Sequence, residues 1–180
     1  MKFEIKVSDN LSLKLHQEED AEAVFKLVDL NREYLRPWLP WVDSTISADD
    51  TRKFIQECQS GFESKEKADF GVMFDGVWIG SMGFHTIKSN SGWAEIGYWL
   101  SKDYTGRGIM TSCVRVMIDY GFNELGLHRI QIQCDSDNIQ SKLIPERLGF
   151  KLEGVIRENC QKNGKYSDGL IYGLLKTEWK

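Results

Sequence analysis

The stretch from Trp93 to Phe122 constrains the fold of this chain more than any other. It starts with an apolar, aromatic-rich run (93–100), continues through a short polar loop and reaches Gly106-Arg107-Gly108. A run of this kind is typical of a buried strand. Beyond the glycines, apolar residues recur at helical spacing, at Ile109, Cys113, Val116 or Met117, and Tyr120. The stretch therefore predicts a strand, a glycine turn and an amphipathic helix in direct succession.

A glycine turn that leads into a helix can bind a phosphate group. The first amides of a helix have no partners within the helix, and the helix dipole adds partial positive charge there. Glycines also let the backbone approach the bound group closely. The dinucleotide pattern G-x-G-x-x-G is not met because Thr111 occupies the third glycine position, and no Gly-Lys-Ser/Thr closes a P-loop. A phosphate site of another kind is expected, with a simple helix-initiating turn as the alternative.

The composition suits one domain spanning residues 1–180. The chain has 180 residues, of which 41% are hydrophobic and 28% charged, and no run of about 18 apolar residues predicts a membrane span. The start, MKFEIKVSD, alternates polar and apolar residues, unlike a signal peptide. Four cysteines without C-x-x-C pairing favour reduced thiols in a cytoplasmic protein and no metal site. The formal charge of −4 argues against direct nucleic-acid binding and favours a basic substrate.

The first half of the chain predicts strands, two helices and a hairpin. Alternation indicates strands at 3–7 and 11–15, and a helix is expected at 19–30 with Ala23, Leu27 and Leu30 on one face. Segment 34–42 contains too many prolines for a regular helix. Ser47 is expected to cap a helix that ends near residue 62. Asp75-Gly76 predicts a hairpin between strands 68–74 and 77–87.

The second half predicts a helix, a strand, a short helix and a final hairpin. After the helix that ends near residue 125, a strand is expected at 128–135, and Asp137 or Asn138 caps a helix that ends at Leu148, before Gly149. Strands at 150–157 and 169–176 flank a turn at 162–164. The whole pattern predicts an α/β (α+β) fold in which about four helices flank a mixed, largely antiparallel sheet.

Two stretches resemble the GNAT superfamily of N-acetyltransferases. Tyr104-Thr-Gly-Arg-Gly-Ile-Met-Thr111, preceded by Glu95-Ile-Gly-Tyr-Trp-Leu100, resembles its acetyl-CoA signature. Thr105 stands where Arg or Gln is usual, and Met110 where the last Gly or Ala is usual. Asp137-Asn-Ile-Gln-Ser141 followed by 147–154 resembles the Asn-x-x-Ser, helix, Gly-Phe, Glu-Gly segment of the RimJ/RimL branch. Trp38-Leu-Pro-Trp41 resembles a third segment of that branch, so the likeness spans nearly the whole chain.

The resemblance implies a GNAT-like acetyltransferase domain. Its activity would move an acetyl group from acetyl-CoA to a primary amine, the N-terminal α-amine of a ribosomal protein, by direct attack in a ternary complex. The alternatives are a small-amine acetyltransferase, acting on a polyamine or an antibiotic, and a CoA-binding module that has lost catalysis. The resemblance further implies a cytoplasmic enzyme that binds acetyl-CoA, uses no metal and contacts no membrane. RimL-like proteins also often self-associate, so both a homo-oligomer and a monomer stay open.

The resemblance assigns cofactor and substrate contacts to particular residues. The pantetheine arm would pair with the backbone of a strand, and the pyrophosphate would bind the following loop. The residues implied in cofactor binding are Tyr98, Trp99, Leu100, Gly106, Arg107, Gly108, Ile109, Met110, Thr111 and Asn138. Trp38 and Trp41 would form one wall of the substrate cleft, although a hydrophobic plug is an alternative. Asp168 would bind the substrate amine or hold its loop.

Catalysis requires a donor to the leaving thiolate and a base for the amine, and the sequence offers candidates for both. Ser141 is implied as the donor to the leaving thiolate, with a role in the first helical turn as the alternative. The position of the usual carboxylate base aligns with Cys160, so Glu158, two residues earlier on the same face of a strand, is a candidate. Glu95 in the central strand is the other candidate, and either carboxylate could instead be exposed or ion-paired. His85 and His128 are expected to be structural.

Overall fold

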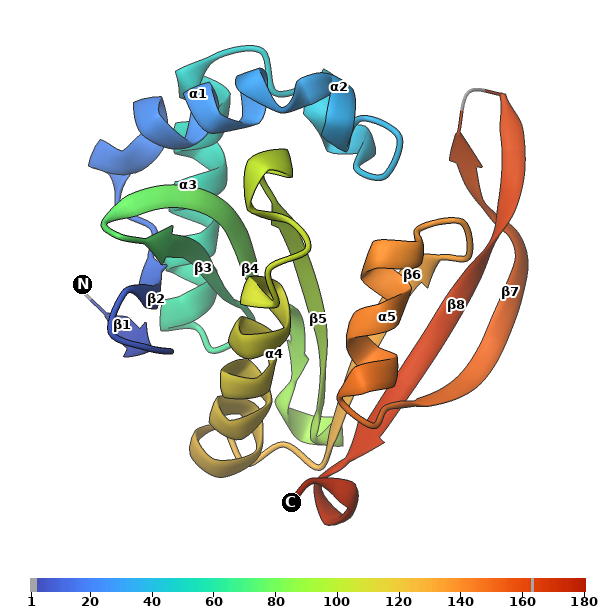
Figure 1. Cartoon of the computed structure of the whole chain (residues 1–180). Coiled ribbons are helices and arrows are strands. Elements are labelled where there is room, and N and C mark those ends of the chain that lie inside the picture. The colour runs from blue at the N-terminus through green and yellow to red at the C-terminus, as the bar shows by residue number, and fades with distance from the viewer. Residues whose placement is uncertain (1–2, 163) are drawn as a thin grey trace.

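An eight-stranded sheet organises the molecule. The computed structural model describes residues 3–162 and 164–180, and its sheet has the order β1-β2-β3-β4-β5-β6-β8-β7 (Figure 1). The strands are β1 (Glu4–Lys6), β2 (Leu11–Leu15), β3 (Ala68–Phe74), β4 (Val77–Lys88), β5 (Trp93–Leu100), β6 (Arg129–Asp135), β7 (Lys151–Lys162) and β8 (Lys165–Leu175). Neighbouring strands are antiparallel except β5 and β6, which are parallel. The expected mixed, largely antiparallel sheet is confirmed.

Five α-helices, counted over the residues that the structure describes, accompany the sheet. They are α1 (Ala21–Leu30), α2 (Arg32–Leu35), α3 (Ala48–Glu63), α4 (Ile109–Asp119) and α5 (Ile139–Arg147). The helix beyond the expected four is α2, a single turn, followed by a 3₁₀ turn at Pro40–Asp43. The prolines therefore break this segment as expected. None of the helices within the described ranges is long and apolar enough to cross a membrane.

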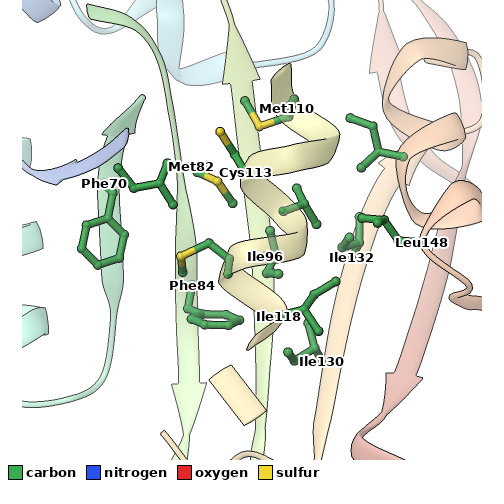
Figure 2. Close-up of a cluster of buried hydrophobic side chains, with 14 of the residues drawn as sticks. Phe70, Met82, Phe84, Ile96, Met110, Cys113, Ile118, Ile130, Ile132 and Leu148 are labelled. Atoms are coloured by element: carbon green, nitrogen blue, oxygen red, sulfur yellow. The ribbon is translucent and has the colours of Figure 1, made fainter. Parts of the chain in front are cut away.

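The hydrophobic core lies between α4 and the middle of the sheet. Figure 2 shows Met110, Cys113 and Ile118 of α4 facing side chains of β4 and β5. Met82, Phe84 and Ile96 are at most 1% exposed there. A π-helical turn, Tyr120–Glu124, continues α4 to the expected end. The predicted strand, glycine turn and amphipathic helix are confirmed, and their buried side chains hold the three elements together.

The buried face of α1 differs from the expected one. Ala21, Val24 and Val28 are buried, whereas Leu30 is 75% exposed. The prediction that Ala23, Leu27 and Leu30 form the buried face was wrong. Seven of the ten residues of α1 are apolar and surround the helix, so periodicity alone could not identify the side that packs on the protein. The cap of α3 is confirmed, since the Asp50 amide donates to Ser47 Oγ at 3.3 Å.

The last hairpin is longer than predicted. Its strands β7 and β8 include the polar segment that was expected to be a loop, because the backbone ladder continues through it to the pair Lys162 and Lys165. The expected turn includes Asn163, which lies outside the described residues. Between Ile156 and Cys160 the register shifts, and Glu158 has a positive φ of 52°. This bulge bends β7 where uninterrupted alternation was assumed.

The sheet divides between β5 and β6. These parallel strands pair from Trp93–Arg129 to Ile96–Ile132. Beyond this point β5 stays paired with β4 as far as Leu100, and β6 stays paired with β8 as far as Asp135. Figure 1 shows the two strands diverging, with α4 in front of one half of the sheet and α5 in front of the other. The separation leaves one backbone edge of residues 97–100 without a strand partner.

Candidate active site

A cavity of about 810 Å³ opens at this division of the sheet. Its walls come from the α1–α2 segment, the ends of β5 and β6, the loop before α4 and the first turns of α5. Most residues assigned to cofactor and substrate by sequence line it, namely Trp38, Trp41, Tyr98, Trp99, Leu100, Gly106, Gly108, Ile109, Met110, Thr111, Asn138 and Ser141. Arg107, Glu95, Glu158 and Asp168 do not line it. The fold thus gathers residues far apart in the chain around one space.

The glycine loop has the conformation that an anion site needs. Gly106 and Gly108 have φ of 74° and 75°, a region that residues with side chains rarely adopt. No side chain caps α4, whose N-cap residue is Gly108, so its first amides remain available to a ligand. Arg107 folds back on the loop, where its Nη2 donates to Asp103 O at 2.7 Å and its guanidinium lies over the Tyr104 ring. Its charge therefore stays beside the loop without entering the cavity.

Hydrogen bonds across the divided sheet hold Ser141 in place. Asn138 Oδ1 accepts from the Ser141 amide at 3.1 Å, which confirms that Asn138 caps α5. Ser141 Oγ donates to the Tyr98 hydroxyl at 3.3 Å, and that hydroxyl donates to the Ser141 carbonyl at 3.0 Å. Burial raises the pKa of Tyr98, so the phenol stays protonated at neutral pH. The serine hydroxyl is oriented toward the cavity by its neighbours and does not cap the helix.

Aromatic side chains form the outer wall of the cavity. The rings of Trp41 and Trp99 lie 6.3 Å apart between centroids, and Lys162 Nζ lies 4.0 Å from the centroid of Trp38. Lys162 also faces Asp137 at 3.9 Å. Because Lys162 belongs to the β7–β8 hairpin, this cation–π contact joins the hairpin to the tryptophan segment across the mouth of the cavity.

The three acidic residues selected by sequence lie outside the cavity lining. Glu95 Oε2 accepts from Gln131 Nε2 at 3.1 Å within the paired part of β5 and β6. Asp168 Oδ1 accepts from the Glu158 amide at 2.9 Å, so Asp168 holds the bulge of β7. The alternation that would place Glu158 on the face of Cys160 is interrupted there. Neither glutamate reaches the cavity wall.

His85 was expected from the sequence to be structural and Asp69 was not considered, but the structure brings the two together at the cavity. His85 lines the cavity, its Nδ1 lies 2.5 Å from Asp69 Oδ1, and the Asp69 side chain is only 2% exposed. The His85 ring covers Gly97, where an added Cβ would be 2.1 Å from its Nε2. A glycine inside a strand often marks such a close approach, so Gly97 was the signal that could have revealed the histidine.

His16, also on the cavity wall, has a different environment. It is fully buried, stacks on Trp78 with centroids 5.2 Å apart and contacts Ser81 Oγ through Nε2 at 3.3 Å. Burial lowers the pKa of His16 to about 4, although the nearby carboxylates of Asp69 and Asp20 oppose this. His16 is therefore neutral and structural. Among the described residues, no group of three or more His, Cys, Asp or Glu side chains could hold a metal ion.

Comparison with known proteins agrees with this geometry. The acetyltransferase (GNAT) domain model matches residues 10–151. YdaF of Bacillus subtilis (strain 168), which has a provisional name as a ribosomal N-acetyltransferase, is 34% identical over 179 residues, covering 99% of this chain and 98% of YdaF. The ribosomal-protein-serine acetyltransferase of Escherichia coli (strain K12) is 31% identical over 171 residues, covering 95% of this chain and 96% of that protein.

The solved structures include a close match in three dimensions. RimL, a ribosomal L7/L12 α-N-protein acetyltransferase in complex with coenzyme A, superposes with a TM-score of 0.92. Its sequence is 27% identical, and the match covers 96% of this chain and 98% of that one. The domain model covers most of the sequence and these relatives cover nearly all of it, so the chain belongs to the GNAT family of acetyltransferases.

Proposed function

We propose that this acetyltransferase modifies the N-terminal α-amine of a ribosomal protein by direct attack on acetyl-CoA in a ternary complex. The unpaired edge of β5 carries the proposal. It lies in the cavity between the glycine loop on one side and the tryptophan wall on the other. Acetyl-CoA and an amine can therefore approach the same four residues from opposite directions. The names of the relatives support a ribosomal protein as the acceptor, which would place the reaction in the cytoplasm.

The cofactor side of the cavity fits an extended chain that ends in a pyrophosphate. The backbone of Tyr98, Trp99 and Leu100 would pair with the amides of the pantetheine arm, in the manner of an added strand. The amides of residues 106–111 would bind the pyrophosphate at the start of α4, with Arg107 as a nearby positive charge. The side chain of Asn138 fixes the adjacent turn of α5.

The chemistry requires an oxyanion donor and a donor to the leaving group. The amine nitrogen attacks the thioester carbon, and a backbone N–H of β5 would stabilise the oxyanion. The C–S bond then breaks, and the Ser141 hydroxyl would turn its proton from Tyr98 to the departing thiolate and donate a hydrogen bond to it. The Tyr98 hydroxyl keeps this serine oriented. No nucleophile on the enzyme is needed, because positioning two reactants together already supplies much of the rate enhancement.

The acceptor side fits the end of a polypeptide better than a compact small molecule. Trp38 and Trp41 form an open, largely apolar wall that can contact several residues of a chain. An α-amine has a pKa of about 8, whereas a lysine amine has about 10.4, so the former is more often neutral at physiological pH. The net charge of −4 favours approach of a basic protein.

The acceptor is tested by thiol release from acetyl-CoA with a panel of amines. Peptides that begin with free Ser or Ala should stimulate release, and the same peptides with a blocked N-terminus but a free lysine should not. Stimulation only by polyamines or aminosugars would contradict the α-amine proposal while retaining an acetyltransferase. Binding of acetyl-CoA without turnover on any amine would instead favour a CoA-binding module.

A matched pair of glycines tests the phosphate site. Gly108 and Gly126 both have positive φ, of 75° and 67°, and both have open space where a Cβ would lie. Alanine at either position should cost a similar folding free energy, about 1–2 kcal/mol. Only Gly108→Ala should weaken CoA binding, by about tenfold or roughly 1.4 kcal/mol, because its Cβ lies against the bound pyrophosphate. Calorimetric titration with CoA measures both variants, and equal affinities would contradict the site.

The role of Ser141 is tested by Ser141→Ala. Loss of a hydrogen bond to a charged thiolate costs roughly 1.5–3 kcal/mol, so kcat should fall by about tenfold to a hundredfold. The KM for acetyl-CoA should change little, since the hydrogen bond strengthens as the thiolate departs. Ser60→Ala, an exposed position on α3, is the control. Steady-state kinetics that give the two variants the same kcat would exclude a donor role for Ser141.

A further inference from the structure

We propose that His85 is the general base that accepts the proton of the attacking amine, and that Asp69 positions its imidazole. The inference deepens the proposed function and rests on it only in requiring a primary amine as acceptor. It assigns a role that sequence reasoning gave to Glu158 or Glu95. Four features of the structure carry it: the place of the ring, its orientation, the charges around it and the partners of the competing carboxylates.

The His85 ring lies at the point where the sheet divides. Gly97 is the first residue of β5 beyond Ile96, the last one that pairs with β6. His85, from the neighbouring strand β4, reaches over Gly97 so closely that an added Cβ there would be 2.1 Å from Nε2. The ring nitrogen therefore lies above the first backbone position whose edge is free for acetyl-CoA. An amine that attacks a thioester held on residues 97–100 from this side of β5 would pass beside this nitrogen.

Asp69 fixes which ring nitrogen is available. Its Oδ1 lies 2.5 Å from His85 Nδ1, and its carboxylate is almost completely buried. A proton on Nδ1 would face this carboxylate, and that tautomer leaves Nε2 with the lone pair that a base needs. The glycines on either side make this arrangement possible. An added Cβ at Gly83 would lie 2.8 Å from Asp69 Oδ1, just as one at Gly97 would meet the His85 ring.

The surrounding charges favour proton acceptance. Burial disfavours the imidazolium, but the hydrogen bond and negative charge of Asp69, together with the charge of Glu95, outweigh it and raise the pKa of His85. Lys67 opposes them more weakly. A base whose pKa lies closer to the working pH is more effective while remaining partly neutral. The half-exposed side chain can also pass its proton to solvent after each turnover.

The proton and electron balance of the step is complete. Nε2 takes one proton from the amine nitrogen as that nitrogen bonds to the thioester carbon, and the carbonyl electron pair moves to oxygen. Collapse of this intermediate breaks the C–S bond and releases the thiolate, which takes a proton from water to give CoA. The His85 imidazolium then loses its proton to water. The reaction needs no oxidant, reductant or further reactant.

Each competing carboxylate is either hydrogen-bonded or lies outside the cavity. Glu95 accepts from Gln131, and Glu158 lies on the exposed bulge of β7, whose amide Asp168 holds. Asp135 does line the cavity, but its two oxygens accept from the Asp137 amide and the Ser167 hydroxyl, each at 2.8 Å. His85 combines a free ring nitrogen, a buried orienting carboxylate and a place at the division of the sheet.

The test compares His85→Gln, Asp69→Asn and the control His128→Gln, an exposed histidine outside the cavity. Each variant is assayed from about pH 5.5 to about pH 9 with the best acceptor found for the wild type. His85→Gln should lower kcat by about a hundredfold, with the dissociation constant of CoA unchanged. Neutral His85 is the active form, so wild-type activity should fall as pH decreases through its pKa. His85→Gln should lose this acidic limb of kcat at saturating acceptor, and any limb that remains should follow the pKa of the acceptor amine, about 8 for an α-amine.

Asp69→Asn distinguishes a role in positioning the His85 imidazole from a role in folding alone, because only the former changes the pH dependence. Removing the carboxylate removes the main cause that raises the pKa of His85, so the acidic limb should move to lower pH. The imidazole resonances of His85, followed by NMR in the same variant, should titrate at that lower pH. His128→Gln should behave as wild type in both measurements.

Two results would overturn the assignment of His85. One is a kcat for His85→Gln within about threefold of the wild-type value, well short of a base contribution. The other is an acidic limb that stays in place in both His85→Gln and Asp69→Asn. A wild-type enzyme that acetylates only small amines would contradict the peptide substrate, yet the same variants would still decide the role of His85 with that acceptor.

Discussion

The partial pairing of β5 with β6 is the constraint on which the rest of this structure depends. Four residue pairs, ending at Ile96–Ile132, join two halves of a sheet that then separate. Backbone amides and carbonyls without partners are costly to bury, so the edge exposed beyond Ile96 favours a ligand that can form backbone-like hydrogen bonds. In the proposed complex, a pantetheine arm, which carries amides in an extended chain, would provide them. The cavity is thus a consequence of how the sheet is built.

Packing holds the two halves of the sheet apart in a fixed geometry. On one side α4 covers β4 and β5 with completely buried residues such as Cys113 and Ile118 (Figure 2). On the other, α5 covers β6 and starts at a capped turn whose Ser141 contacts Tyr98 across the gap. Interiors packed in this way resist deformation, so the reacting groups are preorganised without a ligand. The loop that ends with Gly106-Arg107-Gly108 connects the unpaired edge of β5 to the first turn of α4. The backbone edge and the helix N-terminus are therefore held close together.

Local signals in the sequence predicted most of the fold, and spatial relations accounted for the errors. Three predictions that depend only on neighbouring residues were confirmed. They are the hairpin at Asp75-Gly76, the cap at Ser47 and the succession of strand, glycine turn and helix. The buried face of α1 was not predicted correctly, because apolar residues surround that helix and only its tertiary contacts select Val24 and Val28. The bulge at Glu158 likewise depends on a partner ten residues away, Asp168.

The part of the site that could be predicted from sequence consists of residues that belong to contiguous motifs. The glycine loop and Ser141 belong to contiguous stretches, and the structure brings both to the cavity wall. His85 and Asp69 belong to different strands and become neighbours only through the register of β3 and β4, in which Asp69 lies opposite Gly83. A search for acidic bases near the resembling segments could not find a histidine held in this way. The only local indication of this histidine in the sequence was the glycine at position 97, which the His85 ring covers.

A crystal structure with a peptide joined through its α-amine to CoA by an acetyl linker would test the account most directly. The account predicts the pyrophosphate on the amides that follow Gly106, the pantetheine along residues 97–100 and the sulfur beside Ser141. The former α-nitrogen should lie within hydrogen-bonding distance of His85 Nε2, with the peptide leaving past Trp38 and Trp41. A conjugate whose sulfur or α-nitrogen lies away from the division between β5 and β6 would contradict it.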